Sequence, residues 1–270
     1  MTKPWEAILE ALKSRGHDET AIRFVLEMID NSKIVVETTT HPSDIVNPLF
    51  NTRFIASFII HHTINQHRLD KKAFEYSFRD ALRATARKAE LDPSDTNPGA
   101  DIAVDDVPMS LKTEGSKGIR LDRIVISKLM ESAWMKPYKS LGEFHASIAK
   151  QILPHFKKYD RMFMLRVFPI ENGQHYVLVE IPMEVLRSVK DVKKKDLSPL
   201  TKAKGTSAVV RWKGKTAWTL RFDGSDDKIT LTDLPTSLCR VHGEWKVKWA
   251  AQGTEPSAAS VKRVVQEDLT

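Results

Sequence analysis

The side chains best suited to chemistry in this sequence lie in one short segment. Residues 109–114 read as a strand, and side chains alternate between the two faces of a strand. Ser110, Lys112 and Glu114 therefore share one face. Asp101 begins a preceding β-branched stretch, and a tight hairpin would bring it beside them. A hydroxyl, an ammonium and two carboxylates are thus expected in one place.

That grouping suits the hydrolysis of a phosphodiester. A carboxylate such as that of Asp101 can hold Mg²⁺, which takes oxygen ligands and keeps several waters. The ion stabilises charge on the phosphate and lowers the pKa of a bound water. The ammonium of Lys112 can orient that water and offset the charge that develops during attack. Asp101 is therefore predicted to bind metal, and Lys112 to position the attacking water.

The segment resembles the PD-(D/E)XK nuclease superfamily, which includes most type II restriction endonucleases. Asp101 matches the first acid of the family motif, and Lys112 matches its lysine. The resemblance covers residues 70–182. It implies a mixed sheet with flanking helices, bound Mg²⁺ and cleavage of double-stranded DNA.

At Ser110 the sequence departs from the family, which usually has Asp or Glu there. The resemblance then implies that a glutamate from elsewhere completes the metal site. Glu114, on the same strand face, and Glu131, on the polar face of a helix expected at 119–134, are equal candidates. Glu75, on an earlier helix, ranks behind them. Ser110 itself marks the place of the missing acid.

A rival motif lies near the end of the chain. Glu244 and Lys246 form an acid-x-Lys triplet, and Asp233 precedes it at an interval typical of the family. The segment around Asp101 is preferred because a helix and further strands follow it, as the fold requires. Too little chain follows Glu244 to supply them.

The fold class expected is α/β, with a mixed β-sheet flanked by helices as in restriction endonucleases. Apolar residues recur at helical spacing in some segments and alternate in others. Helices are expected at residues 4–30, 52–66, 71–90, 119–134 and 140–158, and strands at 102–104, 109–114, 162–170, 174–181, 207–212, 216–222, 228–232 and 240–249.

The chain is expected to divide into regions that differ in composition and in expected secondary structure. These are a helical N-terminal region (1–70), a nuclease core (71–186), a basic linker or loop (187–205), a β-rich C-terminal region (206–250) and a tail (251–270).

A net charge of +7 favours an anionic partner. The basic side chains expected to contact DNA are Lys117, Arg120, Arg123, Arg211, Arg240 and Lys246. Cys239 is the single cysteine, so a cysteine zinc site and an internal disulfide are excluded. The chain starts without the apolar core of a signal peptide, and a membrane partner is not expected. A cytoplasmic location fits these features.

The function predicted is Mg²⁺-dependent cleavage of double-stranded DNA at a short specific sequence, as in type II restriction enzymes. A homodimer is expected, because two-fold symmetric DNA suits a two-fold symmetric protein. Two alternatives stay open. One is a repair or recombination nuclease of the same superfamily, and the other is a basic nucleic-acid-binding protein without catalysis.

Overall fold

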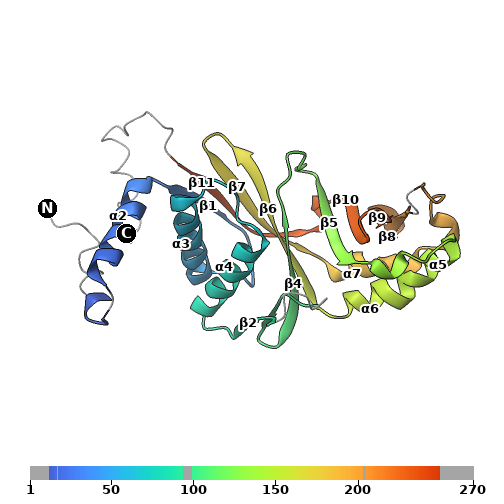
Figure 1. Ribbon diagram of the computed structural model, residues 1–270, viewed down its shortest axis with the longest axis horizontal. Coiled ribbons are helices and arrows are strands. Elements are labelled where there is room, and N and C mark those ends of the chain that lie inside the picture. The colour runs from blue at the N-terminus through green and yellow to red at the C-terminus, as the bar shows by residue number, and fades with distance from the viewer. Residues whose placement is uncertain (1–11, 17, 94–98, 203–204, 250–270) are drawn as a thin grey trace.

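Two β-sheets form the frame of the protein (Figure 1). The computed structural model describes residues 12–16, 18–93, 99–202 and 205–249, and every structural statement below concerns these residues. The larger sheet has the strand order β1-β11-β7-β6-β4-β3-β2, and the smaller has the order β5-β10-β9-β8. The strands are β1 (Val35–Thr40), β2 (Ala89–Leu91), β3 (Ile102–Val104), β4 (Val107–Glu114), β5 (Arg123–Glu131), β6 (Arg161–Ile170), β7 (Gly173–Ile181), β8 (Thr206–Trp212), β9 (Lys215–Asp223), β10 (Lys228–Pro235) and β11 (Arg240–Lys248).

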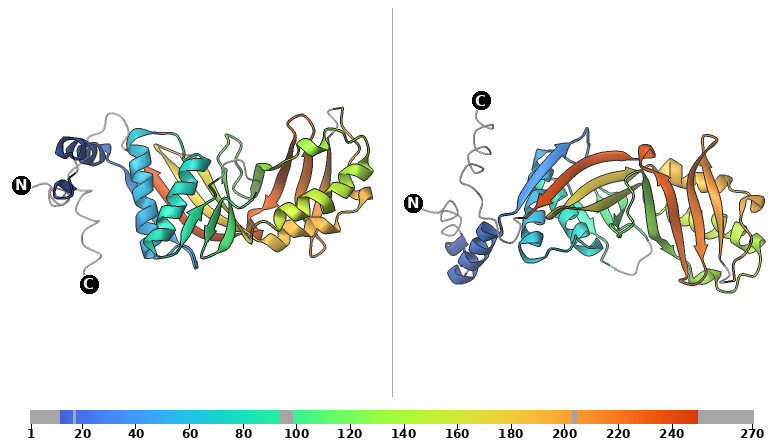
Figure 2. Two further views of the ribbon diagram at one scale, coloured as in Figure 1. Left: turned by 60° about the horizontal axis from the view of Figure 1, so that its bottom comes forward. Right: turned by 90° about the horizontal axis from the view of Figure 1, so that it is seen from above.

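Helices cover the sheets on opposite sides of the molecule. α3 and α4 pack on one face of the larger sheet, and α5, α6 and α7 pack beside the smaller sheet (Figure 2). The helices are α2 (Glu19–Ser32), α3 (Pro48–Ile64), α4 (Lys71–Ala84), α5 (Leu141–Ser147), α6 (Leu153–Phe156) and α7 (Met183–Arg187), with a π-helical turn η2 (Ile148–Ile152) and short 3₁₀ turns η1 (Ala133–Met135), η3 (Ser188–Asp191), η4 (Lys194–Asp196) and η5 (Thr236–Leu238). None of these helices is long and apolar enough to cross a membrane.

The helix that flanks the predicted site begins at a clear capping signal. The side chain of Asp70 accepts a hydrogen bond from the backbone N–H of Ala73, which satisfies one free donor at the start of α4. Phe74, Phe78 and Leu82 then recur at helical spacing and are fully buried against the larger sheet. The opposite edge of the helix is polar and stays near solvent. The helix predicted at 71–90 is confirmed and ends earlier, at Ala84.

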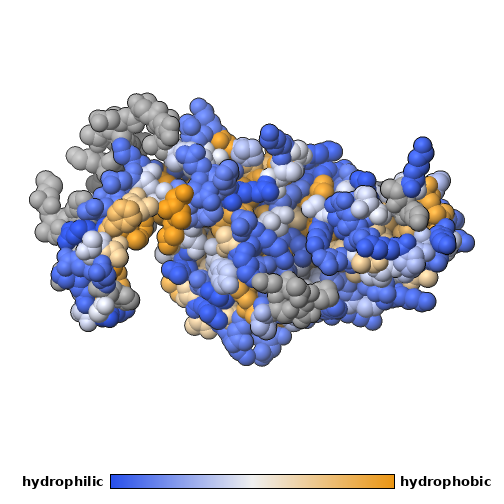
Figure 3. Space-filling view, in the orientation of Figure 1, coloured by the Kyte–Doolittle hydropathy of each residue, from blue (hydrophilic) through white to orange (hydrophobic). Residues whose placement is uncertain are grey.

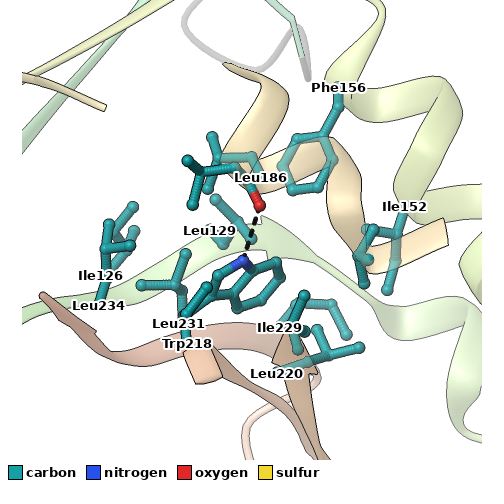
Figure 4. Packing of buried hydrophobic residues seen from close by; sticks show 14 of the residues in the cluster. Ile126, Leu129, Ile152, Phe156, Leu186, Trp218, Leu220, Ile229, Leu231 and Leu234 are labelled. Carbon is teal, nitrogen blue, oxygen red and sulfur yellow. Dashed lines mark hydrogen bonds between the residues drawn. The ribbon is translucent and has the colours of Figure 1, made fainter. Parts of the chain in front are cut away.

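The second core lies between the smaller sheet and α5 to α7. Trp218 on β9 is fully buried there, and its indole N–H donates a hydrogen bond of 3.0 Å to the carbonyl oxygen of Val185 (Figure 4). Leu129, Phe156 and Leu186 pack around it. The N–H of a buried Trp usually has a hydrogen-bond partner, and here this bond connects β9 to α7.

The hairpin that carries the predicted site forms as expected. β3 and β4 are antiparallel, and the turn between them places Asp105 and Asp106 at positive φ values of 50° and 66°. Asp tolerates that conformation better than most residues. The pairing of β3 with β4 ends at Met109, whereas β4 continues to Glu114 beside β6. The edge of β4 after Met109 is therefore open to side chains.

The helix predicted at 119–134 is wrong: the chain there forms strand β5. Ile124, Ile126 and Leu129 are buried, whereas Val125 is 39% exposed. The run Ile124-Val125-Ile126 is β-branched, which disfavours a helix and suits a pleated surface. β5 pairs with β10, about a hundred positions later in the chain. Pairing at that separation overrides a helical spacing of apolar residues.

Other segments also differ from the expected division of the chain. β1 was not predicted, and it pairs with β11, so the first and last described strands are neighbours. The β-rich C-terminal residues contribute to both sheets, since β11 lies in the larger one. The basic segment 187–205 contributes Val189, Val192 and Leu197 to the core. The predicted tail, 251–270, lies outside the described residues.

Candidate active site

Asp101 lies at the open edge of β4, where its carboxylate is held from three sides. Its Oδ2 accepts hydrogen bonds from the backbone N–H of Leu111 at 2.6 Å and from Ser110 Oγ at 3.0 Å. Its Oδ1 accepts one from Lys71 Nζ at 2.7 Å. Burial alone would raise the pKa of Asp101, but Lys112 and Lys71 outweigh it and hold this pKa below its ordinary value. Asp101 is therefore a fixed, ionised carboxylate.

Lys112 occupies the same face of β4 as Ser110, as predicted. Its Nζ lies 3.7 Å from Asp101 Oδ2, and its side chain is 16% exposed. Burial lowers the pKa of Lys112, and the negative charge of Asp101 opposes that shift without cancelling it. A lysine next to a carboxylate and largely withdrawn from solvent can give a proton or orient a water more readily than a surface lysine.

Glu75 on α4 joins this group, although the sequence ranked it third. It is 7% exposed. Its carboxylate lies 3.2 Å from Lys71 Nζ, the same ammonium that binds Asp101. The charge of Glu75 also acts on the pKa of Lys112, so the three groups form one electrostatic cluster. The signal that could have found Glu75 is its spacing of four residues from Lys71 on a capped helix.

Ser110 is a positioning residue in this geometry. The side chain is fully buried, and its Oγ donates to Asp101 Oδ2. A hydroxyl at this position thus holds the Asp101 carboxylate in place, where an acid would repel it. The departure from the family motif at Ser110 is consistent with the recruitment of a carboxylate from α4.

Glu114 does not belong to the cluster, although the sequence predicted that it would complete the metal site. Its Oε2 accepts a hydrogen bond of 2.6 Å from Arg166 Nε, and its Oε1 accepts one of 2.9 Å from the backbone N–H of Val125. Glu114 and Arg166 are 8% and 2% exposed. Both oxygens are committed to the junction between the two sheets, which leaves this carboxylate unsuited to a metal.

Glu131 is also separated from Asp101. Because the predicted helix is a strand, Glu131 lies at the end of β5 and pairs with Lys228 of β10 in the smaller sheet. Its side chain is 76% exposed and forms an ion pair with Lys128 at 2.6 Å. Glu131 therefore lies outside the candidate site, to which Glu75 contributes a carboxylate instead.

The rival motif does not assemble. Glu244 lies on β11 of the larger sheet, and Asp233 lies on β10 of the smaller one. The carboxylate oxygens of Glu244 are each paired with a histidine, His41 and His175, at 2.9 Å. Lys246 is exposed on the same strand.

The basic residues predicted to contact DNA divide into separate groups. Lys117 and Arg120 lie on the connection between β4 and β5, and Arg123 is the first residue of β5. Lys117 lines an open groove together with Arg68 and Lys71, so this group adjoins the candidate site. The others lie farther along the sheets: Arg211 on β8, and Arg240 and Lys246 on β11. Arg240 is engaged by Asp44 at 3.2 Å.

Two carboxylates, those of Asp101 and Glu75, are the groups here that could hold a metal ion. The described part of the chain has no cluster of three or more His, Cys, Asp or Glu side chains arranged for a metal. Mg²⁺ does not require one, since it is often bound by one or two carboxylates together with waters and substrate phosphates. Asp101 and Glu75 already share one cation, Lys71 Nζ. An all-oxygen pair of this kind fits a hard ion such as Mg²⁺.

Comparison with known proteins gives three matches. The family SmaI, described as type II site-specific deoxyribonuclease, matches residues 34–247. The type II restriction enzyme SmaI of Serratia marcescens is 34% identical over 207 residues, which are 75% of this chain and 81% of that protein. A solved restriction endonuclease in complex with substrate DNA aligns with 78% of this chain and 86% of its own, at 13% identity and a TM-score of 0.34.

Proposed function

We propose, since the chain belongs to the SmaI family of type II site-specific deoxyribonucleases, that its DNA-cleaving site consists of Asp101, Glu75 and Lys112. The family makes the chain an endonuclease that cuts DNA at specific sites, which decides against the two alternatives left open by the sequence. The observation that carries the assignment is that Asp101 and Glu75, from different elements, both contact Lys71 Nζ beside Lys112.

In this proposal each side chain has one role. Asp101 and Glu75 would hold Mg²⁺. The Lys71 ammonium would have to move away to make room for the ion, and it can do so because the Lys71 side chain is 49% exposed. When bound there, Mg²⁺ would stabilise charge on the phosphate and lower the pKa of a bound water. Lys112 orients the attacking water and offsets the charge that develops on the phosphate. Ser110 and the Leu111 N–H keep Asp101 in position. The set is then a Ser-x-Lys version of the PD-(D/E)XK site.

The DNA backbone would approach along the groove next to Lys71. Arg68 and Lys117 line that groove, and the Arg68 side chain lies across Gly115, where an added Cβ would meet its Nη1 at 2.5 Å. Glycine at 115 therefore lets Arg68 lie against the end of β4. Cations that line a groove attract phosphates and make binding sensitive to salt. Because its substrate is DNA, we expect the enzyme to act in the cytoplasm.

A homodimer is part of the proposal, because cutting both strands of a symmetric site suits a two-fold symmetric enzyme. Apolar side chains gather on α2 and the facing part of α3 (Figure 3). Phe24, Ile60 and Ile64 are 63%, 54% and 73% exposed there, and Phe24 and Thr63 border one shallow hollow. Exposed apolar patches of this kind mark contact surfaces. We infer that a second copy of the chain covers this apolar patch on α2 and α3.

The test is cleavage of long unmethylated DNA by the purified protein, with Mg²⁺ or with EDTA. Discrete bands that require Mg²⁺ and disappear in Lys112→Ala are expected. Lys246→Ala, from the rival motif, is the matched control and should give the wild-type bands. Bands that persist in Lys112→Ala and vanish in Lys246→Ala would move the active site to β11.

A further inference from the structure

Leu121 stands exposed on the connection between β4 and β5, where the chain passes from the larger sheet to the smaller one. Its side chain is 73% exposed, and the connection projects from the molecule (Figure 1). The roles proposed above do not use this residue. A single exposed leucine needs no explanation by itself, so its surroundings decide whether it has a role.

The backbone around Leu121 is held in place by a buried side chain. The guanidinium of Arg166 donates a hydrogen bond of 3.3 Å to the carbonyl oxygen of Leu121. It also donates to the carbonyl oxygens of Arg120 and Arg123. Arg166 is 2% exposed and is itself held by Glu114, with Nε and Oε2 2.6 Å apart. Connections are usually more mobile than the strands they join, whereas this one presents Leu121 on a fixed backbone.

The same anchor ties Leu121 to the candidate site. Arg166 bridges the Leu121 carbonyl to the end of β4, the strand that carries Lys112. Residues 115–117 of the connection line the groove that also contains Lys71. Lys71 belongs to both the groove and the candidate site, because its ammonium contacts the two carboxylates there. DNA that is cut at this site would therefore extend past the connection.

The side chains around Leu121 are basic, which indicates the kind of partner it meets. Three cations, those of Lys117, Arg120 and Arg123, accompany one carboxylate, that of Asp122. Asp122 lies 3.0 Å from Arg120 and 3.8 Å from Arg123 in exposed pairs, which are weak enough for phosphates to displace. Cations that contact phosphates beside an apolar side chain that meets bases are typical of DNA-binding surfaces. A second copy of the chain would be repelled by these cations.

We propose that Leu121 is a specificity-determining residue, which packs against the base pairs of the DNA next to the cleaved phosphate. Lys117 and Arg120 contact the phosphates beside it, and Arg166 with Glu114 keeps its backbone rigid. A rigid apolar side chain pressed against bases responds to their shape and to the ease with which they unstack, so it discriminates among sequences. This inference rests on the proposed function, because it places DNA at the candidate site.

Leu121→Ala tests the proposal. The substrates are a duplex that carries a mapped cleavage site and duplexes in which one base pair beside the cut is changed. The ratio of single-turnover cleavage rates between the mapped site and the altered sites should fall about tenfold, within the range that one base pair contributes to a specific complex. The melting temperature should not change, because the side chain is exposed. A wild-type ratio, or a loss of rate by one common factor on all duplexes, would overturn the proposal.

Leu49→Ala is the matched control, because Leu49 is also an exposed leucine (62%) but lies on α3. It should keep the wild-type ratio, and a ratio lowered as much as in Leu121→Ala would mean that the effect is not specific to Leu121. Lys117→Ala should behave differently from both. It should weaken the binding of every duplex in Ca²⁺ by a similar factor and reduce the salt dependence of binding, because a phosphate contact is lost.

The failure of this inference is distinguishable from that of the proposed function. If Lys112→Ala cleaves as fast as the wild type, both are overturned. If Lys112→Ala is inactive while Leu121→Ala discriminates as the wild type does, the inference alone is overturned. Sedimentation velocity adds a further outcome: a Leu121→Ala protein that is monomeric where the wild type is dimeric would make Leu121 a contact between two copies of the chain, and would also overturn the inference.

Discussion

Glu114 and Arg166 form a buried ion pair, with Oε2 and Nε 2.6 Å apart and side chains 7% and 3% exposed. The guanidinium of Arg166 also donates to the backbone carbonyl oxygens of Arg120 and Arg123. The pair thus joins the end of β4 to β6 and to the chain at the start of β5. A glutamate that shares a strand face with Lys112 is used for architecture, not for metal binding.

Glu114→Ala should therefore cost stability, by about 3 kcal/mol of unfolding free energy, because it leaves the Arg166 charge buried and without its carboxylate. Urea unfolding followed by tryptophan fluorescence measures this loss. Glu131→Ala, which removes an exposed carboxylate, should change the free energy by less than about 0.5 kcal/mol. A Glu114→Ala protein of normal stability that no longer binds divalent cations would return Glu114 to the metal site.

Glu75→Gln, in contrast to Glu114→Ala, should slow DNA cleavage and leave the stability of the fold nearly unchanged. The partners of Glu75 are exposed lysines, Lys71 and Lys72, at 3.2 and 3.6 Å, so the free energy of unfolding should change little. The cleavage rate at fixed Mg²⁺ should fall on the order of 100-fold or more, because one of two metal ligands is lost. Higher Mg²⁺ should restore part of the rate. Cleavage by Glu75→Gln at the wild-type rate would remove this residue from the site.

The closeness of Asp101 and Lys112 could be predicted from the sequence, whereas the approach of Glu75 could not. The β3–β4 hairpin is local, since strand alternation and an Asp-Asp turn specify it within a dozen residues. The approach of Glu75 depends on how α4 docks over the edge of the sheet, which is a tertiary relationship. Choosing among glutamates requires that relationship, so Glu114 and Glu131 could not be excluded from spacing alone.

The error at 119–134 has a related cause. A segment with apolar residues at 121, 124, 125 and 129 satisfies a helical pattern as well as a strand pattern. The segment forms a strand because it pairs with β10, about a hundred residues later, which offers partners to Ile124 and Ile126. The helices α3 and α4 were predicted more reliably because caps and apolar spacing agree within each segment.

Lys71→Met should strengthen the binding of divalent cations. The Lys71 ammonium lies between Asp101 and Glu75, so it competes with a metal for the same two carboxylates. Its removal should tighten binding about three- to tenfold, since a nearby like charge is lost. Titration of the apoprotein with Tb³⁺ or Ca²⁺ measures this directly. Lys72→Met, whose ammonium lies 3.6 Å from Glu75 and thus farther from it than that of Lys71, should have a smaller effect. Weaker binding by Lys71→Met would show that the two carboxylates are not the ligands.

Lowering the pH should reduce the free energy of unfolding, because the carboxylate of Glu180 becomes protonated. Burial alone would raise the pKa of Glu180, but hydrogen bonds from Arg161 and His242 outweigh it and lower this pKa to about 2. A depressed carboxyl pKa gives stability that is present above the ordinary value near 4.5 and is lost as the pH falls toward 2. Glu180→Gln should lower the unfolding free energy near neutral pH by on the order of 2 kcal/mol, allowing for solvent near the pair.

The difference between Glu180→Gln and the wild type should shrink as the pH falls from 4.5 to 2.5. Guanidinium unfolding at a series of pH values measures it. Glu37→Gln, at an exposed ion pair with Lys248, is the control and should follow the wild type at every pH. A constant difference across the acid range would mean that the charge of Glu180 is not the source of its effect.

Phe24→Lys and Ile64→Lys should convert the proposed dimer to a monomer. Both side chains belong to the exposed apolar surface of α2 and α3, and a buried ammonium in a contact between two copies is costly. Sedimentation velocity at a concentration where the wild type is dimeric measures the change. Val209→Lys replaces an equally apolar residue, 38% exposed on β8, and should remain dimeric.

A monomeric enzyme should also nick one strand more often than it cuts both, because each active site serves one strand. If Phe24→Lys and Ile64→Lys stay dimeric and Val209→Lys does not, the two copies meet through the smaller sheet.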